Sequence, residues 1–582
     1  GVQNEAIGYL SMEDNTEGSC NVALGSALGS NTTGGNNVGI GFIALSNNTT
    51  ASNNTAVGKS ALQENTTGAS NVAVGSNSLD SNTTGNNNVA VGATAGAAIT
   101  TGSSNTVVGQ NALQANTTAS DNTAIGLNSL YTNTTGAGNT SVGKSALLLN
   151  TTGANNAAVG KSSMGSNTTG SDNTAIGVES LVSATTAGSN TAIGRQAMCK
   201  TTTGADNTAV GSFALCANTT GYINVAVGHD AMKVNTTGQG NVGIGGYALD
   251  ANTTGSRNIA IGCSALSANT TASDNAAVGR NSLLANTTGY SNSALGRDSL
   301  TANTEGHSNV AVGQNTMAAN TTGDGNTAVG QAALDANTTA NNNTAVGKSS
   351  LGANTTGANN VAVGSLALDA NTTANDNTAV GHSALTANTT GVENVAVGQS
   401  ALASNTTANT NTAIGYFSLG TNTTGNNNTA VGKNSLLANT TGTRNTAIGV
   451  SALDANTVGE KNVAIGKGPE FDINSRGQKT LKSWLPDNFE TTDSFLDNFS
   501  NIKGLKNVQT ENMSILIKNA YGDNPKKFTE AMKGLSEYNK FVNTLPEGLK
   551  LDLDHPLSKA FLKGSGVSPD KLLYVTPIDR SY

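Results

Sequence analysis

The chain has 582 residues with 70 glycines, and only 11% of its residues are charged and 4% aromatic, for a formal net charge of -8. An enzyme of this length would need more aromatic side chains for several compact cores, so the composition favours a fibrous or solenoid protein. Weak acidity argues against a nucleic-acid partner, and no apolar run approaches the roughly 20 residues that span a bilayer, so no membrane insertion is expected.

A strict repeat fills residues 1–466. The phrase Asn-x-Ala-Val-Gly, with conservative variants, places its glycine at Gly8, Gly25 and Gly41 and then at every seventeenth residue to Gly466. The only irregular step is the 16 residues from Gly25 to Gly41. Such spacing predicts a solenoid in which each unit stacks only on its neighbours. We therefore expect an all-β parallel β-solenoid, a β-roll of 28 coils.

Coil positions are counted from the Asn that opens each phrase, and the consensus is N-T/V-A-V/I-G-x-x-A/S-L-x-A/S-N-T-T-G/A-x-x. We predict short β-type runs at positions two to four and seven to nine. Turns are expected at the glycine of position five and at the Asn-Thr-Thr-Gly phrase. Because parallel strands lie about 4.8 Å apart, the coils would form a rod of roughly 130 Å.

Two columns of asparagine are expected along the rod. The opening Asn occurs in every coil, and the Asn at position twelve is replaced only at Ile99, Ala184 and Thr201. An amide can donate to one neighbouring coil and accept from the other, so we interpret the columns as structural ladders rather than ligand sites. The first column includes Asn343, Asn360, Asn377, Asn394, Asn411 and Asn428.

The apolar columns suggest association of identical chains. Val or Ile at position four and Leu at position nine are large, whereas positions three and eight are small and are expected to face the opposite side of the strand. Both faces would then be apolar, and the small-residue columns at positions three and eight are expected to pack closely against another copy of the chain. Burial in one thin core contributes much less free energy than the conformational entropy of ordering each coil costs. We expect a parallel homotrimer; the alternative is a monomeric solenoid with one thin core.

The repeated phrases resemble those of known fibres. Asn-x-Ala-Ile-Gly, as at Asn173 to Gly177, resembles the head repeats of trimeric autotransporter adhesins, which implies a left-handed β-roll assembled as a trimer. The phrase ALxANTTGxxNTAVG, from Ala333 to Gly347 with Ala340 in place of the turn glycine, is similar to the chlorovirus glycoprotein repeat and to phage-type tail-fibre repeats. We recognise neither the anchor typical of those adhesins nor the chaperone-peptidase domain of fibres, so the resemblance favours a virion fibre or spike.

Basic side chains recur at coil position six, directly after the glycine. In register they would form a broken stripe that could hold acidic glycans. The competing interpretation, which the negative balance of the repeat region favours, is a solvated turn that aids solubility. The stripe contains Lys59, Lys144, Lys161, Arg195, Arg280, Arg297, Lys348, Lys433 and Lys467, joined by His229 and His382.

Coil position ten carries two cysteines and several aspartates. Cys199 and Cys216 lie on adjacent coils, so their Cα atoms are expected about 4.8 Å apart, within disulfide range. Parallel side chains would hold the Cβ atoms slightly too far apart, so stacked thiols are favoured over a bond. The aspartates never occupy adjacent coils and are predicted to be solvated turn charges, with no catalytic, metal or cofactor site; they are Asp80, Asp250, Asp335, Asp369 and Asp454.

A second domain is expected over 467–582, because all seven prolines and the only tryptophan follow the last repeat glycine. Asn524 can cap a helix with Pro525 in its first turn, and an apolar face follows at helical spacing from Phe528 to Phe541. We predict a small, mainly α-helical cap. It would serve as a trimer clamp, a plug of the sheet edge or a recognition tip.

These observations predict a non-enzymatic structural fibre or spike on a virion surface, a rigid homotrimeric shaft that carries the C-terminal domain for host attachment. Expected partners are the chain itself and a host cell-surface glycan or protein. Other virion or surface proteins are expected at an upstream segment, since Gly1 lies inside the repeat pattern. The alternatives are a bacterial cell-surface adhesin passenger and a capsid cement or scaffold rod. An ice-binding solenoid is least favoured, because the Thr columns at positions thirteen and fourteen lie in a turn.

Overall fold

The computed structural model of the chain describes residues 1–468, and every regular element in that range is a three-residue β-strand at coil positions two to four. The predicted helical domain over 467–582 lies outside the described residues, apart from its first two positions. The strands are β1 (Glu5–Ile7), β2 (Val22–Leu24), β3 (Val38–Ile40), β4 (Thr55–Val57), β5 (Val72–Val74), β6 (Val89–Val91), β7 (Thr106–Val108), β8 (Thr123–Ile125), β9 (Thr140–Val142), β10 (Ala157–Val159), β11 (Thr174–Ile176), β12 (Thr191–Ile193), β13 (Thr208–Val210), β14 (Val225–Val227), β15 (Val242–Ile244), β16 (Ile259–Ile261), β17 (Ala276–Val278), β18 (Ser293–Leu295), β19 (Val310–Val312), β20 (Thr327–Val329), β21 (Thr344–Val346), β22 (Val361–Val363), β23 (Thr378–Val380), β24 (Val395–Val397), β25 (Thr412–Ile414), β26 (Thr429–Val431), β27 (Thr446–Ile448) and β28 (Val463–Ile465).

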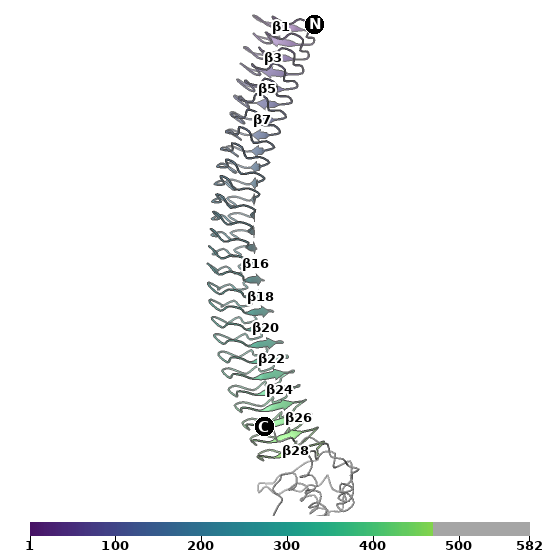
Figure 1. The fold of residues 1–582 in the computed structure, drawn as a ribbon, viewed down its shortest axis with the longest axis vertical. Helices are drawn as coiled ribbons and strands as arrows, with labels where there is room; N and C mark the ends of the chain where they lie inside the picture. Colours follow the sequence, from purple (N-terminus) through teal and green to yellow (C-terminus); the bar gives the residue numbers. More distant parts are fainter. Residues whose placement is uncertain (469–582) are drawn as a thin grey trace, which may run out of the picture.

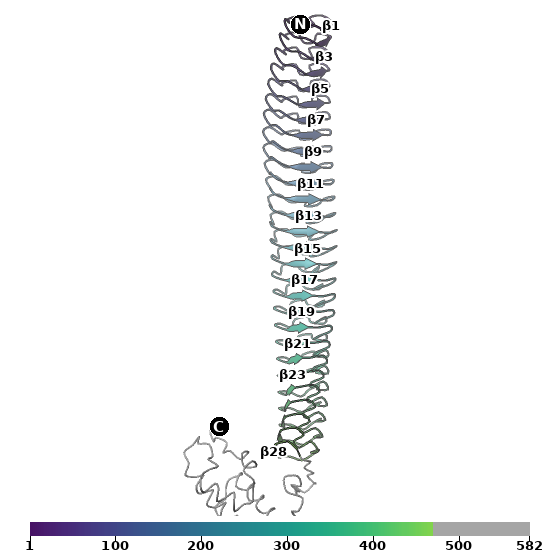
Figure 2. The same cartoon turned by 90° about the vertical axis from the view of Figure 1, so that its right-hand side faces the viewer.

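All 28 strands belong to one parallel sheet. Each strand pairs with the next along the chain in constant register, so that Thr344 lies beside Val361 and Val361 beside Thr378. Figure 1 shows the coils stacked in a single column from β1 to β28, and Figure 2 shows the strands following one another along one side of it. The predicted all-β parallel solenoid of 17-residue coils is confirmed.

The single 16-residue step is absorbed in a turn and not in the sheet. Val22 pairs with Val38 in the same register as every other coil. The missing residue belongs to the turn after β2, where Gly25 has a φ of 95°, whereas the other repeat glycines have φ between 130° and 141°. A short coil is therefore compatible with an unbroken hydrogen-bond ladder.

Positions seven to nine form a turn, and the prediction of a second β-type run is wrong. In the coil that opens at Asn343, Ser349 and Leu351 have φ of 51° and 52°, and the same left-handed pair recurs along the column. Left-handed residues at alternate positions curl the chain and cannot form an extended pleat. As a result Ser350 and Leu351 both point into the coil, instead of facing opposite sides.

The interior of each coil is built from small strand residues and one large side chain. Ala345, Ser350 and Leu351 are fully buried, and the same positions are buried throughout the column. The prediction that positions three and eight form a second face for another chain is therefore wrong, because they line the inside. A left-handed leucine costs about 1–2 kcal/mol, and full burial of its side chain contributes about 1.5–3 kcal/mol, so burial offsets the backbone cost.

The repeat glycine lets successive coils approach closely. Gly347 has a φ of 132°, and a Cβ atom placed there would lie 2.5 Å from the carbonyl oxygen of Gly364 in the next coil. A side chain at this position would meet both an unfavourable backbone angle and a backbone clash. The glycine column thus fixes the spacing on which the parallel ladder depends.

Candidate functional site

The first asparagine column joins each coil to the next through the backbone. The backbone N–H of Asn360 donates to Oδ1 of Asn343 at 2.9 Å, and Nδ2 of Asn360 donates to the carbonyl oxygen of Ala374 at 2.8 Å. These side chains are fully buried, so an unpaired amide among them would be costly. The same backbone-to-amide bond is made by Asn343, Asn360, Asn377, Asn394, Asn411 and Asn428.

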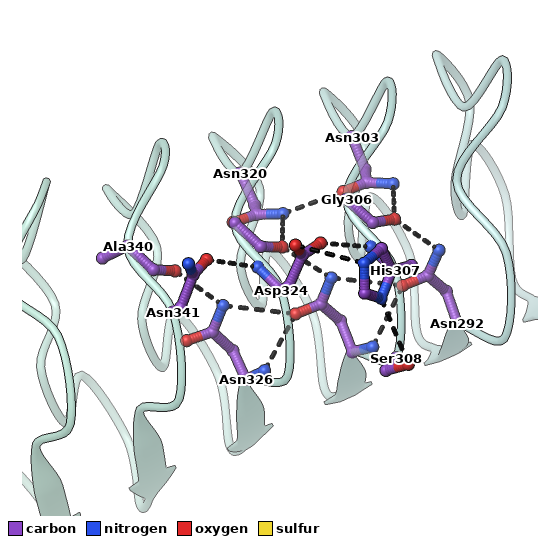
Figure 3. Close-up of polar contacts among 12 residues, drawn as sticks. Asn292, Asn303, Gly306, His307, Ser308, Asn320, Asp324, Asn326, Ala340 and Asn341 are labelled. Atoms are coloured by element: carbon purple, nitrogen blue, oxygen red, sulfur yellow. Dashed lines mark hydrogen bonds and ion pairs between the residues drawn. The ribbon is translucent and has the colours of Figure 1, made fainter.

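The second asparagine column is a direct amide-to-amide ladder. Nδ2 of Asn371 donates to Oδ1 of Asn354 at 2.8 Å and to the carbonyl oxygen of Ala374 at 3.1 Å. The two columns therefore meet at the carbonyl of coil position fifteen. Figure 3 shows this convergence at Gly306, which accepts from Asn292 at 2.8 Å and from Asn303 at 2.9 Å.

Breaks in the second column leave buried polar atoms without partners. Oδ1 of Asn82 and Oδ1 of Asn167 have no hydrogen-bond donor, and each lies one coil before a replacement, at Ile99 and at Ala184 respectively. The hydroxyl of Thr201, the third replacement, is also buried and unpaired. The second asparagine column therefore stabilises the stack least in the coils that hold these unpaired atoms.

Two further hydrogen-bond columns were not predicted. Threonine at position thirteen donates its hydroxyl to the same position of the next coil, as from Thr355 to the carbonyl oxygen of Thr372 at 3.0 Å. At position sixteen a side-chain oxygen accepts from the preceding coil's backbone, as from Asp324 N–H to Oδ1 of Asn341 at 2.7 Å (Figure 3). Asn, Asp and Ser side chains all act as this acceptor. Because several residue types fill position sixteen, the repeat consensus gave no sign of the second column.

Position sixteen also carries an aromatic and ionic cluster that sequence reasoning missed. The ring of Tyr290 stacks on His307, with centroids 4.7 Å apart. Nε2 of His307 lies 3.2 Å from Oδ2 of Asp324, whose other oxygen accepts the His307 backbone N–H at 2.8 Å (Figure 3). The contacts join three consecutive coils. Each residue type occurs once or twice at this position, so no pattern marked them.

The basic stripe lies at exposed turns, and only part of it is brought together. The Arg195 guanidinium lies 5.4 Å from the centre of the Phe213 ring, and Nε of Arg297 lies 3.1 Å from Oδ2 of Asp298. Lys144 lies beside Lys161 on the next coil, and Arg280 lies beside Arg297 in the same way. Arg195 and Lys348 have no basic residue at position six of either neighbouring coil.

Cys199 and Cys216 are joined in a disulfide, which differs from the expected stacked thiols. Their Cα atoms are 4.9 Å apart, as the coil spacing requires. The two side chains turn toward each other instead of standing parallel, and this permits the bond. Cys20 and Cys263 are exposed free thiols.

The aspartates of position ten are less solvated than predicted. Burial raises the pKa of Asp80, Asp335 and Asp369, and Oδ1 of Asp80 is buried without a hydrogen-bond partner. They remain on separate coils, and no three His, Cys, Asp or Glu side chains within residues 1–468 gather as a metal site would require. A repetitive β-solenoid of this kind is typical of structural proteins rather than enzymes.

The largest candidate surface is the outer face of the sheet, formed by positions two and four. From Val22 to Val463, position two holds only Thr, Val, Ala, Ile and Ser, and position four holds only Val, Ile and Leu. Many of these position-four side chains are strongly exposed, from 36% at Val74 to 54% at Ile465. Three-residue strands stacked over roughly 130 Å give a face about 10 Å wide, on the order of 1,300 Å². The position-four side chains form a continuous aliphatic column along this face, and soluble monomers rarely leave contiguous apolar patches larger than a few hundred Å² in water.

No protein-family model, curated protein or solved structure matches this chain. Within the described part of the chain, no helix has the length and apolar character to cross a membrane. The assignment of function therefore depends on the coil column and on its uncovered sheet face.

Proposed function

We propose that this chain forms the shaft of a non-enzymatic structural fibre, a rigid homotrimer on a virion surface whose C-terminal residues serve host attachment. The observation that carries the proposal is the outer sheet face, which is free of charge over 27 consecutive strands from β2 to β28. Covering that face with identical chains removes it from water and completes a core that one thin coil lacks.

The coil column suits a mechanical role. Each coil is tied to the next by strand pairing, two asparagine columns and a threonine column, as at Thr344, Asn360, Asn371 and Thr355. With no inserted residue between Gly41 and Gly466, the number of coils sets the length of the rod. The column holds its two ends roughly 130 Å apart. Several copies of a C-terminal recognition domain on one shaft would add avidity.

The narrow face supports three copies over two. A strand of three residues is about 10 Å wide, so three such faces can close around one axis with their apolar side chains inside. Two faces packed as a sandwich would leave both long edges of the interface open to water. The similarity of the repeats to viral fibre repeats supports the virion surface as the location.

The test combines assembly with location. Purified full-length chain is analysed by sedimentation velocity and negative-stain microscopy, and immunogold labelling with antibody to residues 1–468 is carried out on intact particles and cells. Three-chain rods, label projecting from virions and competition of host adsorption by the purified chain would support the proposal. Label on a bacterial surface, label only on capsids without competition, or compact single chains would each contradict it.

A further inference from the structure

Two charged edges border the outer sheet face. We define the basic edge as position six, two residues after position four, and the acidic edge as position seventeen, two residues before position two. Position six carries no Asp or Glu in any coil. Position seventeen carries six acids and only three bases, Arg257, Arg444 and Lys461. The acids are exposed side chains: Asp121, Asp172, Asp206, Asp274, Asp376 and Glu393.

Opposite charges on the two edges occur at matching heights between β8 and β18. Arg280 follows β17 and Asp274 precedes the same strand, so one coil carries both signs. Other members of the two edges lie within one coil of each other, which is about 4.8 Å along the column. These pairs are Lys144 after β9 with Asp121 before β8, Lys161 after β10 with Asp172 before β11, and Arg195 after β12 with Asp206 before β13. Lys59 and Lys348 have no acid within one coil. At the C-terminal end of the column like charges lie at matching heights, Lys433 near Arg444 and Lys467 with Lys461, so the pattern is confined to the coils from β8 to β18.

The chain cannot join its own two edges. Positions seventeen and six of one strand are separated by six residues of mostly extended backbone, about 20 Å. Accordingly, none of Lys144, Lys161, Arg280, Asp121 and Asp172 forms an ion pair within residues 1–468. Asp274 is an exception through Arg257, at 2.7 Å. The edges therefore present mostly unpaired charge along the length of an apolar face, which is the arrangement of an interface rim.

Symmetry decides which edges meet. Copies related by rotation about the rod axis bring the basic edge of one chain against the acidic edge of the next, at the same height and without stagger. Antiparallel rods packed on the same face would bring the basic edge against the basic edge and the acidic edge against the acidic edge. Like charges placed opposite each other disfavour that arrangement.

We propose that neighbouring copies of this chain lie parallel and level, with the basic edge of one copy against the acidic edge of the next. The proposal rests on the proposed homotrimeric shaft and adds which surfaces meet, with what polarity and in what register. The edges act as selectors of partner orientation, while the aliphatic face between them supplies the buried area. This use differs from the glycan-holding stripe considered from the sequence.

A cross-link tests register and polarity together. Cys263 is a free, exposed thiol on the basic edge after β16, and Arg257 lies on the acidic edge before the same strand. In full-length R257C, the two thiols of one chain are about 20 Å apart, beyond disulfide reach, whereas those of neighbouring level copies adjoin. Mild oxidation should then yield covalent rings of three chains on a non-reducing gel. R444C, which lies eleven coils from Cys263, is the matched control and should give none.

Charge reversal provides a second, independent measurement. Lys144→Glu, Lys161→Glu and Arg195→Glu together make both edges acidic from β8 to β13, and sedimentation at low salt should shift from multi-chain rods to single chains. Adding Asp121→Lys, Asp172→Lys and Asp206→Lys reverses the second edge and should restore the multi-chain species. Circular dichroism checks that both variants keep their β-structure.

The outcomes separate this inference from the fibre itself. Three-chain rods without the R257C link, or rods indifferent to charge reversal, overturn the parallel edge contact and leave the fibre standing. A link of equal yield in R444C also overturns it. Single-chain wild-type protein overturns both the edge contact and the homotrimer. The inference is supported if R257C gives the covalent link, R444C gives none, and reversing the charges of the second edge restores the multi-chain species.

Discussion

The second asparagine column can be tested by an isosteric change at one rung. Nδ2 of Asn354 donates to Oδ1 of Asn337 at 3.1 Å and to the carbonyl oxygen of Gly357 at 2.9 Å. Asn354→Asp keeps the shape but removes both donors and places a carboxylate against two acceptors in a fully buried position. Gly357 keeps its bond from Asn343, whereas Oδ1 of Asn337 loses its only donor.

A buried acceptor left without a donor costs about 1–3 kcal/mol, and the added carboxylate increases that cost, so we expect at least about 2 kcal/mol of local destabilisation. Because 1.36 kcal/mol corresponds to a factor of ten, backbone amides of the coils around residue 354 should exchange roughly 30-fold faster. Hydrogen–deuterium exchange of the full-length chain, read by mass spectrometry, measures this directly. Coils far along the column should be unchanged, since each coil contacts only its neighbours.

Asn375→Asp is the matched control for the added charge. Asn375 is exposed and its Oδ1 accepts the Ala358 backbone N–H at 2.7 Å, a task that a carboxylate also performs. Exchange near residue 375 should therefore remain close to wild type. If Asn354→Asp exchanges no faster than Asn375→Asp, the buried amide column does not stabilise the stack and the reasoning fails.

Three further substitutions probe the column. Gly347→Ala should lower the stability by about 1–3 kcal/mol, because the added Cβ meets the Gly364 carbonyl 2.5 Å away at a left-handed φ; an unchanged calorimetric unfolding temperature would contradict this. Ala184→Asn supplies an amide for the orphaned Oδ1 of Asn167, and nearby amides should exchange roughly fivefold more slowly for about 1 kcal/mol gained; faster exchange would refute it. Asp335→Asn should stabilise the fold by about a few tenths of a kcal/mol at pH 7, after solvent screening. Burial raises the pKa of the Asp335 carboxyl, so its ionisation lowers the stability of the folded chain. The wild type therefore loses stability as pH rises above the ordinary pKa of 3.8, and the stability gained by Asp335→Asn should vanish at pH 3. An equal benefit at pH 3 would exclude this cause.

The stacking of the coils could be read from the sequence because it depends on spacing alone. One β-run, one turn glycine and one opening Asn recur at a fixed interval, and the parallel register follows from that interval. The second run was misread because a Ser-Ser-Leu segment such as Ser349 to Leu351 suits a strand by composition. Left-handed backbone at Ser349 and Leu351 is imposed by stacking and burial, which no local propensity reports.

The direction of the strand faces was misjudged for a related reason. Alternation correctly separates position three from positions two and four, but it does not say which side is inside. The small side chain turns inward in nearly every coil, Val107 of β7 being the one large residue buried at position three; at Gly39 an added Cβ would lie 3.1 Å from Cβ of Ala27. Small residues at positions three and eight thus mark a tight interior, and the outer face carries the larger aliphatic residues.

Small-angle X-ray scattering of the purified full-length chain tests the central claim most directly, since it reports length and mass together. A coil column that covers its outer face with sister chains requires a maximum dimension of at least roughly 130 Å and a mass near three times the 58.0 kDa of one chain. A compact particle with the mass of one chain would contradict both the stacked coils and the shared apolar face.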